Sequence, residues 1–240
     1  MSLFTISDLH LSTAEGTNKS MEVFGSRWAD YTERLRRNWE AVVTDRDTVV
    51  IPGDISWALT LPEAASDMHF IDRLPGRKIL GKGNHDFWWS TMKKHREFFE
   101  KENITSVSFL FNNAYETDEC IVAGTRGWFL EEDDVSTKNN VDFEKLCKRE
   151  VLRLSASLGE AVKLQQTCDK EIIVFMHFPP YWGGKEVSEL LDLTESAGVK
   201  KIYFGHIHGT YLTEPVIYHR NTELRLISAD YLNFLPKIVL

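Results

Sequence analysis

Cysteine is scarce in this chain. Its 240 residues include three, Cys120, Cys147 and Cys168, which lie far apart and form no CxxC pair. An odd number of widely spaced thiols excludes a disulfide framework and is typical of a reducing compartment. We therefore expect all three cysteines to have structural roles.

Long apolar runs and a targeting segment are missing as well. No apolar stretch reaches the roughly 18 residues of a membrane-spanning helix. The segment MSLFTISDLH has neither the basic n-region nor the apolar h-region of a signal peptide. Both features favour a cytoplasmic protein without a membrane partner.

The chain also lacks a surplus of positive charge. Its formal net charge is −8, because 36 Asp and Glu outnumber 28 Lys and Arg. An acidic surface disfavours non-specific binding to nucleic acid or anionic membrane. A nucleic-acid substrate held through metal ions stays open, and the oligomeric state is not readable.

Short apolar runs alternate with amphipathic segments along the chain. Helices are predicted over 28–45, 141–168 and 185–198, the last with Gly198 as its C-terminal cap. The tail from 215 onward is predicted to form closing strands with a turn at Asn221. The β-branched and aromatic runs predict further strands at 3–7, 48–52, 78–83, 106–111, 120–125, 171–177 and 201–206. No linker interrupts this pattern, which predicts one α/β domain over 1–240.

Five of the predicted strands are followed by polar side chains that can bind metals. In open α/β sheets, ligands bind at the carboxyl ends of the strands. Asp-x-His and His-x-His have a spacing of two, which in an extended segment directs both side chains to one side. Flanking glycines allow close backbone approach. The seven candidate ligands are Asp8, His10, Asp54, Asn84, His177, His206 and His208, with His85 as a candidate eighth.

The chemistry of this set points to a transition-metal centre. The absence of cysteine from it excludes a closed thiolate zinc site. Carboxylates with imidazoles favour Mn, Fe, Zn or Ni over a calcium site built from oxygens alone. Seven ligands are too many for one ion and enough for two. Two metals about 3.5–4 Å apart can clamp the attacking and leaving oxygens of a phosphoryl transfer.

In this order, the motifs resemble those of the calcineurin-like metallophosphoesterase superfamily. They are DLH at 8–10, GD at 53–54, GNHD at 83–86, His177 and GHIH at 205–208, and together they span residues 8–208. The resemblance implies a four-layer α-β-β-α sandwich, in which two mixed β-sheets are flanked by helices. It also implies a metal-dependent phosphoric ester hydrolase with two divalent or trivalent transition-metal ions.

The resemblance assigns roles to the motif positions. One metal would be held by Asp8, His10 and His208, and the other by Asn84, His177 and His206. Asp54 would bridge them together with a hydroxide, which would be the nucleophile. His85 would not bind metal; it would act as general acid or stabilise charge in the transition state.

The sequence GDISWAL departs from the Ser/Thr protein phosphatase branch of this superfamily. Trp57 stands where that branch has an Asp that orients the catalytic His, and Ala58 where it has a phosphate-binding Arg. We therefore do not expect a phosphatase of that branch. Asp86 is predicted to orient His85 instead, and Arg126 to contact the phosphate, or else to form a surface salt bridge.

Aromatic residues cluster near the polar strand ends and have two interpretations. They either stiffen the loops by packing, or form a rim that stacks a base or covers an apolar leaving group. The aromatic residues are Trp57, Phe87, Trp88, Trp89, Trp128, Phe178, Tyr181 and Trp182. From the second interpretation we expect Trp57 and Trp182 to bind substrate, and Arg126 and Asn84 are expected to bind it as well.

Several other polar residues are expected to have no part in the site. His69, His95 and His219 are predicted to be structural or at the surface, and Asp30, Asp45 and Asp47 to be solvated or capping. The acidic segment LEEDDVSTKNN at 130–140 is either a solvated loop or a flap near a pocket.

Two classes of function remain. The favoured one is a phosphodiesterase or broad small-molecule phosphohydrolase with catalytic residues His85 and Asp54, and a phosphomonoesterase shares the same metal core. The other is a non-catalytic metal-binding scaffold of the same fold. A scaffold has no use for the non-ligating His85, which favours the enzyme.

Overall fold

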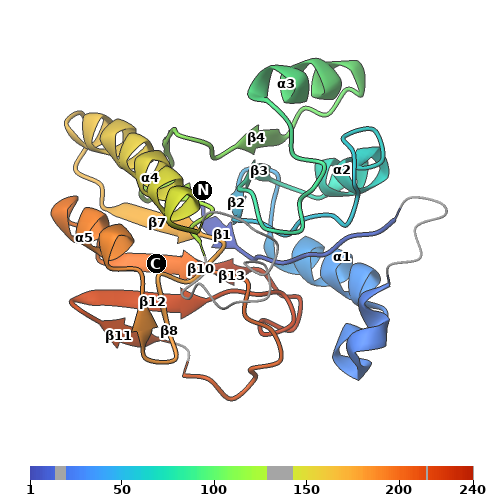
Figure 1. Cartoon of the computed structure of the whole chain (residues 1–240). Coiled ribbons are helices and arrows are strands. Elements are labelled where there is room, and N and C mark those ends of the chain that lie inside the picture. Colours follow the sequence, from blue (N-terminus) through green and yellow to red (C-terminus); the bar gives the residue numbers. More distant parts are fainter. Residues whose placement is uncertain (14–19, 129–142, 215, 240) are drawn as a thin grey trace.

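The computed structural model describes residues 1–13, 20–128, 143–214 and 216–239 (Figure 1). Two β-sheets face each other, and helices cover their outer faces. The described helices offer none with the length and apolarity needed to cross a membrane.

The first sheet has the order β13-β1-β2-β3-β4, in which β1 to β4 run parallel and β13 is antiparallel to β1. Its outer face packs against three helices, α1 (Tyr31–Val42), α2 (Ala65–Arg73) and α3 (Met92–Lys101). Its strands are β1 (Leu3–Thr5), β2 (Thr48–Ile51), β3 (Arg77–Leu80), β4 (Val107–Phe109) and β13 (Lys237–Ile238).

The second sheet has the order β11-β12-β10-β7-β6-β5. Its parallel centre is flanked by antiparallel edge strands. Helices α4 (Phe143–Gln165) and α5 (Ser188–Ser196) cover its outer face. Its strands are β5 (Tyr115–Glu116), β6 (Ile121–Thr125), β7 (Ile172–Met176), β10 (Lys201–Phe204), β11 (Ile217–His219) and β12 (Thr222–Leu226). A small hairpin pairs β8 (Tyr181–Trp182) with β9 (Lys185–Glu186).

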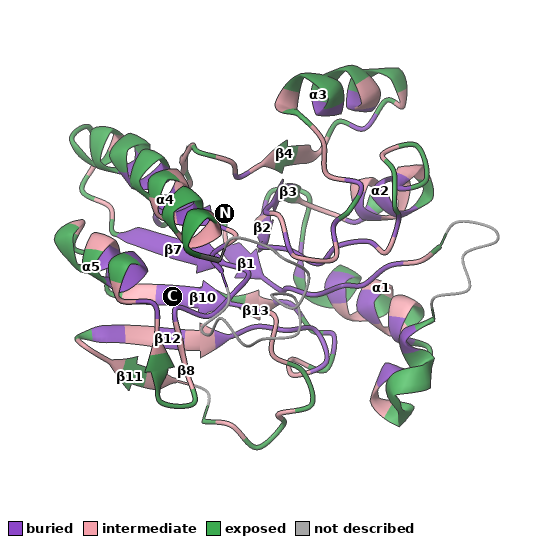
Figure 2. Ribbon diagram, in the orientation of Figure 1, coloured by how far each residue is buried: buried purple, intermediate pink, exposed green. Residues whose placement is uncertain are grey.

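The inner faces of the two sheets form a shared apolar layer. Val50 and Ile79 of the first sheet pack with Val122, Phe175 and Tyr203 of the second, all of them buried. Strands β7 and β10 are accordingly coloured mostly as buried in Figure 2. Because these strands are covered on both faces, their sequences are almost continuously apolar. The predicted four-layer α-β-β-α sandwich is confirmed.

The predicted strands are present, although most end earlier than expected. The turn at Asn221 is also confirmed, since Arg220 and Asn221 both have positive φ between β11 and β12. Gly198 ends α5 with φ +73° and donates its N–H to the carbonyl of Glu195 at 2.9 Å.

Helices α2 and α3 were missed by the sequence analysis. Helix α2 is only nine residues long, and α3 is largely charged. The N-terminus of α3 is capped by Thr91, whose hydroxyl accepts a hydrogen bond from the N–H of Lys94 at 3.3 Å. Two short 3₁₀ helices, Met21–Phe24 and Ser26–Trp28, precede α1.

Candidate metal centre

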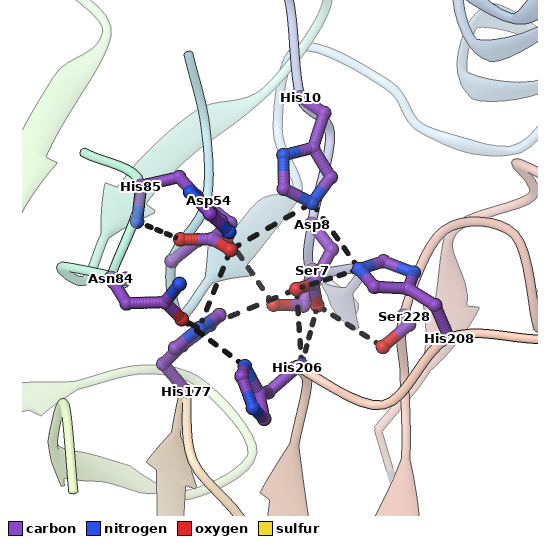
Figure 3. A network of polar contacts seen from close by, with 12 residues as sticks. Ser7, Asp8, His10, Asp54, Asn84, His85, His177, His206, His208 and Ser228 are labelled. Atoms are coloured by element: carbon purple, nitrogen blue, oxygen red, sulfur yellow. Dashed lines mark hydrogen bonds and ion pairs between the residues drawn. The ribbon is translucent and has the colours of Figure 1, made fainter. Parts of the chain in front are cut away.

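The carboxyl ends of parallel strands from both sheets meet at one place, and the seven predicted ligands meet there with them (Figure 3). The first sheet contributes the segments after β1, β2 and β3, and the second those after β7 and β10. The side chains of Asp8, Asp54 and His177 lie at the middle of the cluster and are buried.

The backbone turns sharply at four of these residues. Asp8, His10, Asp54 and His206 have φ of 60°, 46°, 51° and 70°. The spacing argument for Asp8-x-His10 and His206-x-His208 assumed an extended segment, whereas the backbone turns into the left-handed region at Asp8, His10 and His206. Left-handed conformations cost free energy in residues other than glycine, and they concentrate at functional sites.

Two glycines permit the close approach of these segments. A Cβ on Gly83 would lie 2.0 Å from Oδ1 of Asp54, and one on Gly205 would lie 2.2 Å from Oδ2 of Asp8. The expectation that glycines beside the histidines make room for the backbone is thus confirmed for Gly205.

Asp86 joins the loops that follow β2 and β3. Its buried carboxylate accepts hydrogen bonds from the backbone N–H groups of Asp54, Ile55, Ser56 and Gly83 and from the indole of Trp88, at 2.7–3.2 Å. These donors occupy both oxygens. We predicted that Asp86 orients His85. The hydrogen bonds of its carboxylate instead hold the backbone of Asp54 and Gly83 in place.

One group of ligands gathers around His208. Its Nε2 lies 3.2 Å from Nε2 of His10 and 3.5 Å from Oδ1 of Asp8. On the other side of the ring, Nδ1 lies 2.8 Å from Oδ1 of Asp230. One atom each of Asp8, His10 and His208 lies within 4.8 Å of the others, close enough to hold an ion together.

A second group gathers around His177. Its Nε2 lies 2.7 Å from Oδ1 of Asn84 and 3.5 Å from Oδ2 of Asp54. The same Asn84 oxygen lies 3.1 Å from Nδ1 of His206. Oδ2 of Asp54 is also 3.7 Å from Nε2 of His10, so Asp54 lies between the two groups. Asp8, Asp54 and His177 form a second set able to hold an ion.

Burial and close charges shift the pKa values of several groups in the cluster. Burial, together with the neighbouring charges of Asp8 and Asp86, raises the pKa of Asp54 well above its usual value. Burial also lowers the pKa of His10 to about 3 and that of His177 well below its usual value. The lowered pKa values keep His10 and His177 neutral, which is the form in which an imidazole binds a metal ion.

The donor atoms therefore fit a pair of transition-metal ions. Nε2 of each of His10, His177 and His208 lies 3.5–3.7 Å from a carboxylate oxygen of Asp8 or Asp54. Imidazole with carboxylate and amide oxygen suits Mn, Fe, Zn or Ni.

A pocket of ≈ 440 Å³ opens beside the first group. Trp57 forms part of its wall and stacks on His10, with ring centroids 5.0 Å apart, and lies 4.3 Å from His85. Trp57 therefore lies beside the ligand cluster, as predicted from the sequence. The pocket is lined by His10, Met21, Phe24, Trp28, Trp57, His85, His208, Gly209, Tyr211 and Asp230.

Phe178 lies beside the second group, with its ring centroid 4.4 Å from that of His206, and Phe87 lies 6.4 Å from His85, but three of the tryptophans pack elsewhere. Trp88 is buried in the first core, and Trp128 packs on Phe178. Trp182 lies on β8 and packs against Phe204, with ring centroids 5.9 Å apart. The packing interpretation therefore describes these residues better than a rim around the pocket.

Arg126 is buried beside the second group rather than exposed in a surface salt bridge. It follows β6, and its carbonyl accepts a hydrogen bond from the N–H of Phe178, next to His177, at 2.8 Å. Its guanidinium lies over Trp128 and 3.5 Å from Glu150.

The residues set aside in the sequence analysis have structural contacts. His95 is buried, and its Nε2 accepts the N–H of Ser90 at 3.0 Å. His219 stacks on Tyr181. Asp47 caps a turn by accepting from Thr44. All three cysteines are free. The predicted loop or flap at 130–140 lies outside the described residues.

The sequence analysis missed two buried carboxylates around the site. Asp230 contacts His208, and Asp67 accepts hydrogen bonds from Thr13 and Ser56, which tie together the segments after β1 and β2. Asp230 follows the apolar run LRLISA, so the strand-end rule that found the other ligands could have found it. Trp28, part of the pocket wall, was recognised only as a helical residue.

Comparison with known proteins agrees with this geometry. The model of the calcineurin-like phosphoesterase family matches residues 1–210. No curated protein matches the chain.

Solved structures share the fold at low sequence identity. The phosphopantetheinyl hydrolase of Mycobacterium tuberculosis is 14% identical with a TM-score of 0.55, over 100% of this chain and 95% of that one. The protein TT1561 of Thermus thermophilus is 10% identical with a TM-score of 0.55, over 95% and 89% of the two chains.

Proposed function

The chain belongs to the calcineurin-like phosphoesterase family and is a metal-dependent phosphoester hydrolase, and from this premise we propose that it cleaves small organic phosphodiesters. The observation that carries the proposal is the pocket beside His85. Its wall includes the side chains of Met21, Phe24, Trp28 and Trp57, which offer little to a bare phosphate and suit an organic substituent.

In the proposed centre, Asp8, His10 and His208 hold one ion, and Asn84, His177 and His206 hold the other, with Asp54 shared between them. This division is supported by the two groups of short distances around His208 and His177. When bound, two such ions supply positive charge to the phosphoryl oxygens and lower the pKa of a coordinated water.

The proposed role of His85 is to protonate the leaving oxygen. Its ring lies 5.6 Å from that of His10 and 4.3 Å from that of Trp57, between the ligands and the pocket. Its backbone N–H donates to Oδ1 of Asp54 at 2.8 Å, which holds the histidine's loop against the cluster. A proton donor placed there would serve a leaving group that enters the pocket.

Trp57 has a second proposed role beside substrate contact. Its ring lies against both His10 and His85, so it limits the rotation of both imidazoles. A restricted imidazole is better placed for proton transfer than a free one. Asn84 is proposed to contact substrate as well, since its side chain is only partly buried.

The proposal is tested by comparing bis-p-nitrophenyl phosphate with p-nitrophenyl phosphate as substrates of the Mn²⁺-loaded protein. We expect a higher kcat/KM for the diester, loss of turnover after metal removal, and a fall of about 10²–10⁴-fold in His85→Ala. Metal content, measured alongside, should be unchanged in that variant because His85 is not a proposed ligand. His69→Ala, which removes a histidine of α2 that pairs with Glu102 away from the site, is the matched control.

Preference for the monoester would overturn the diesterase proposal and favour a phosphomonoesterase. Full activity of His85→Ala would show that His85 is not the proton donor. It would not contradict the proposed metal centre.

A further inference from the structure

A cluster of positive charge lies next to the second ligand group. Glu150 of α4 is completely buried, and its Oε1 lies 2.7 Å from Arg153, 3.5 Å from Arg126 and 3.6 Å from Arg149. The other oxygen, Oε2, accepts a hydrogen bond from Thr125 at 2.9 Å. One carboxylate is thus shared by three guanidinium groups, so that, among the described residues, the ion pairs at Glu150 leave positive charge uncompensated.

Arg126 has unused hydrogen-bonding capacity within this cluster. Only 10% of its side chain is exposed. Its Nε and Nη2 are buried and find no hydrogen-bond acceptor among the described residues. A buried guanidinium normally fills its donors, because leaving them unpaired costs free energy. These N–H groups are therefore suited to an anionic ligand.

Lys82 adds a fourth cation from the facing sheet. It follows β3 and precedes Asn84 by two residues, whereas Arg126 follows β6. Burial and the positive charges of Arg126, Arg153 and Arg149 lower the pKa of Lys82. In the part of the chain that the structure describes, its ammonium makes no hydrogen bond or ion pair.

The position of the cluster relates it to the substrate. Strands β6 and β7 are parallel neighbours, and Thr125 pairs with Met176, so Arg126 lies beside His177. The apolar pocket, by contrast, adjoins His10 and His208. The cations therefore border the metal centre at the Asn84 and His177 group, and the apolar pocket borders the His208 group.

We propose that Lys82 and Arg126 bind a second phosphate of the substrate, close to the reacting phosphorus but not itself hydrolysed. The inference rests on the proposed phosphoesterase function. Two divalent metal ions held with Asp8 and Asp54 would balance the charge of a coordinated hydroxide and of the reacting diester. Several further cations fit a dianionic phosphate better than a carboxylate, and Arg binds phosphate through paired N–H donors. The substrate class is organic compounds in which two phosphates lie close together.

The test is calorimetric binding of methylenebisphosphonate and of inorganic phosphate to the metal-loaded protein. We expect the wild type to bind the bisphosphonate at least about tenfold more tightly, as two charge-assisted hydrogen bonds allow. Lys82→Met should reduce this preference about tenfold, and Arg126→Lys, which keeps the charge but loses the fork of donors, should reduce it as well. Arg36→Gln removes an exposed cation of α1 and should keep the preference.

The proposal would be overturned if the wild type bound methylenebisphosphonate no more tightly than inorganic phosphate. So would an equal loss of affinity for both anions in Lys82→Met, which would place this cation on the reacting phosphate. Because binding is measured without turnover, the two proposals fail separately. An inactive protein that prefers the bisphosphonate counts against the diesterase alone, and an active one without the preference counts against the second phosphate alone.

Discussion

Nδ1 of His208 lies 2.8 Å from Oδ1 of Asp230, a completely buried carboxylate. Burial lowers the pKa of His208, but hydrogen bonds to Asp230 and Asp8 outweigh it and raise the pKa to about 10. A carboxylate behind a ligating imidazole fixes the ring's orientation and tautomer and makes it a stronger ligand. The other oxygen of Asp230 accepts the N–H of Gly209 at 3.0 Å, so Asp230 holds both the ring and its loop.

We expect Asp230→Asn to weaken metal binding by about 10–100-fold, the cost of losing such a partner. The amide keeps an acceptor for Gly209 but no longer supplies the charge behind His208. Metal affinity measured by competition with a chromophoric chelator tests this. The control is Asp192→Asn, an exposed carboxylate paired with Arg220. Equal affinities in the two variants would show that Asp230 has no role in metal binding.

Gly83→Ala should disrupt the centre sterically. The added Cβ would lie 2.0 Å from Oδ1 and 2.2 Å from the backbone nitrogen of Asp54. Overpacking of this kind typically destabilises a protein by about 1–3 kcal/mol. Here it must also displace Asp54, so we expect loss of bound metal together with a lower free energy of unfolding.

Gly159→Ala is the matched substitution for that experiment. Gly159 lies on the exposed side of α4, and a Cβ there would meet no atom within 4 Å. Replacing a glycine inside a helix by alanine should stabilise the protein by about 0.5–1 kcal/mol. Denaturant unfolding and metal analysis of both variants give the comparison. A Gly83→Ala protein with full metal content and unchanged free energy of unfolding would contradict this prediction.

The seven candidate ligands could be found from sequence because each follows an apolar strand. Parallel strands bring their carboxyl ends together, so position along the chain predicted position in space. Asp230 follows the same rule and was overlooked. No sequence pattern predicts the left-handed conformations of Asp8 and His10. Contacts between loops impose these conformations, such as the 2.9 Å hydrogen bond from the N–H of His10 to the carbonyl of Asp54.

The pocket could not be predicted in the same way. Trp28 and Tyr211 are distant in sequence, and only the packing of 3₁₀ segments against the loop after β10 places both beside His208. Several tryptophans near the strand ends point into the cores instead. Closeness in sequence to a ligand therefore did not predict which aromatic ring lines the pocket.

Comparison of Trp57→Ala with Trp182→Ala decides which tryptophan contacts the substrate. Stacking of an aromatic group on Trp57 is expected to contribute about 1–3 kcal/mol, so Trp57→Ala should lower kcat/KM for the diester about tenfold or more. Trp182 packs on Phe204 in the second core. Its removal should mainly lower the free energy of unfolding. A larger loss of kcat/KM in folded Trp182→Ala than in Trp57→Ala would instead support the prediction that Trp182 binds substrate.

The buried ring of His95 should make the protein sensitive to acid. Burial lowers its pKa from 6.5 to about 4, and its Nε2 must stay unprotonated to accept the N–H of Ser90 at 3.0 Å. Between these two pH values the unfolded chain binds a proton that the folded protein does not. The free energy of unfolding therefore falls as the pH is lowered through this range.

His95→Gln removes the titrating group and keeps an acceptor for Ser90. We expect the variant to be less stable than the wild type at pH 7, because the glutamine side chain fills less of the space between Trp89 and Phe109. Its free energy of unfolding should nevertheless fall less steeply as the pH drops from 6.5 to about 4. Urea denaturation at a series of pH values measures both quantities. The metal ligands titrate in both proteins, so only the difference between the two slopes reports on His95. Parallel curves would show that His95 is not a source of the acid sensitivity.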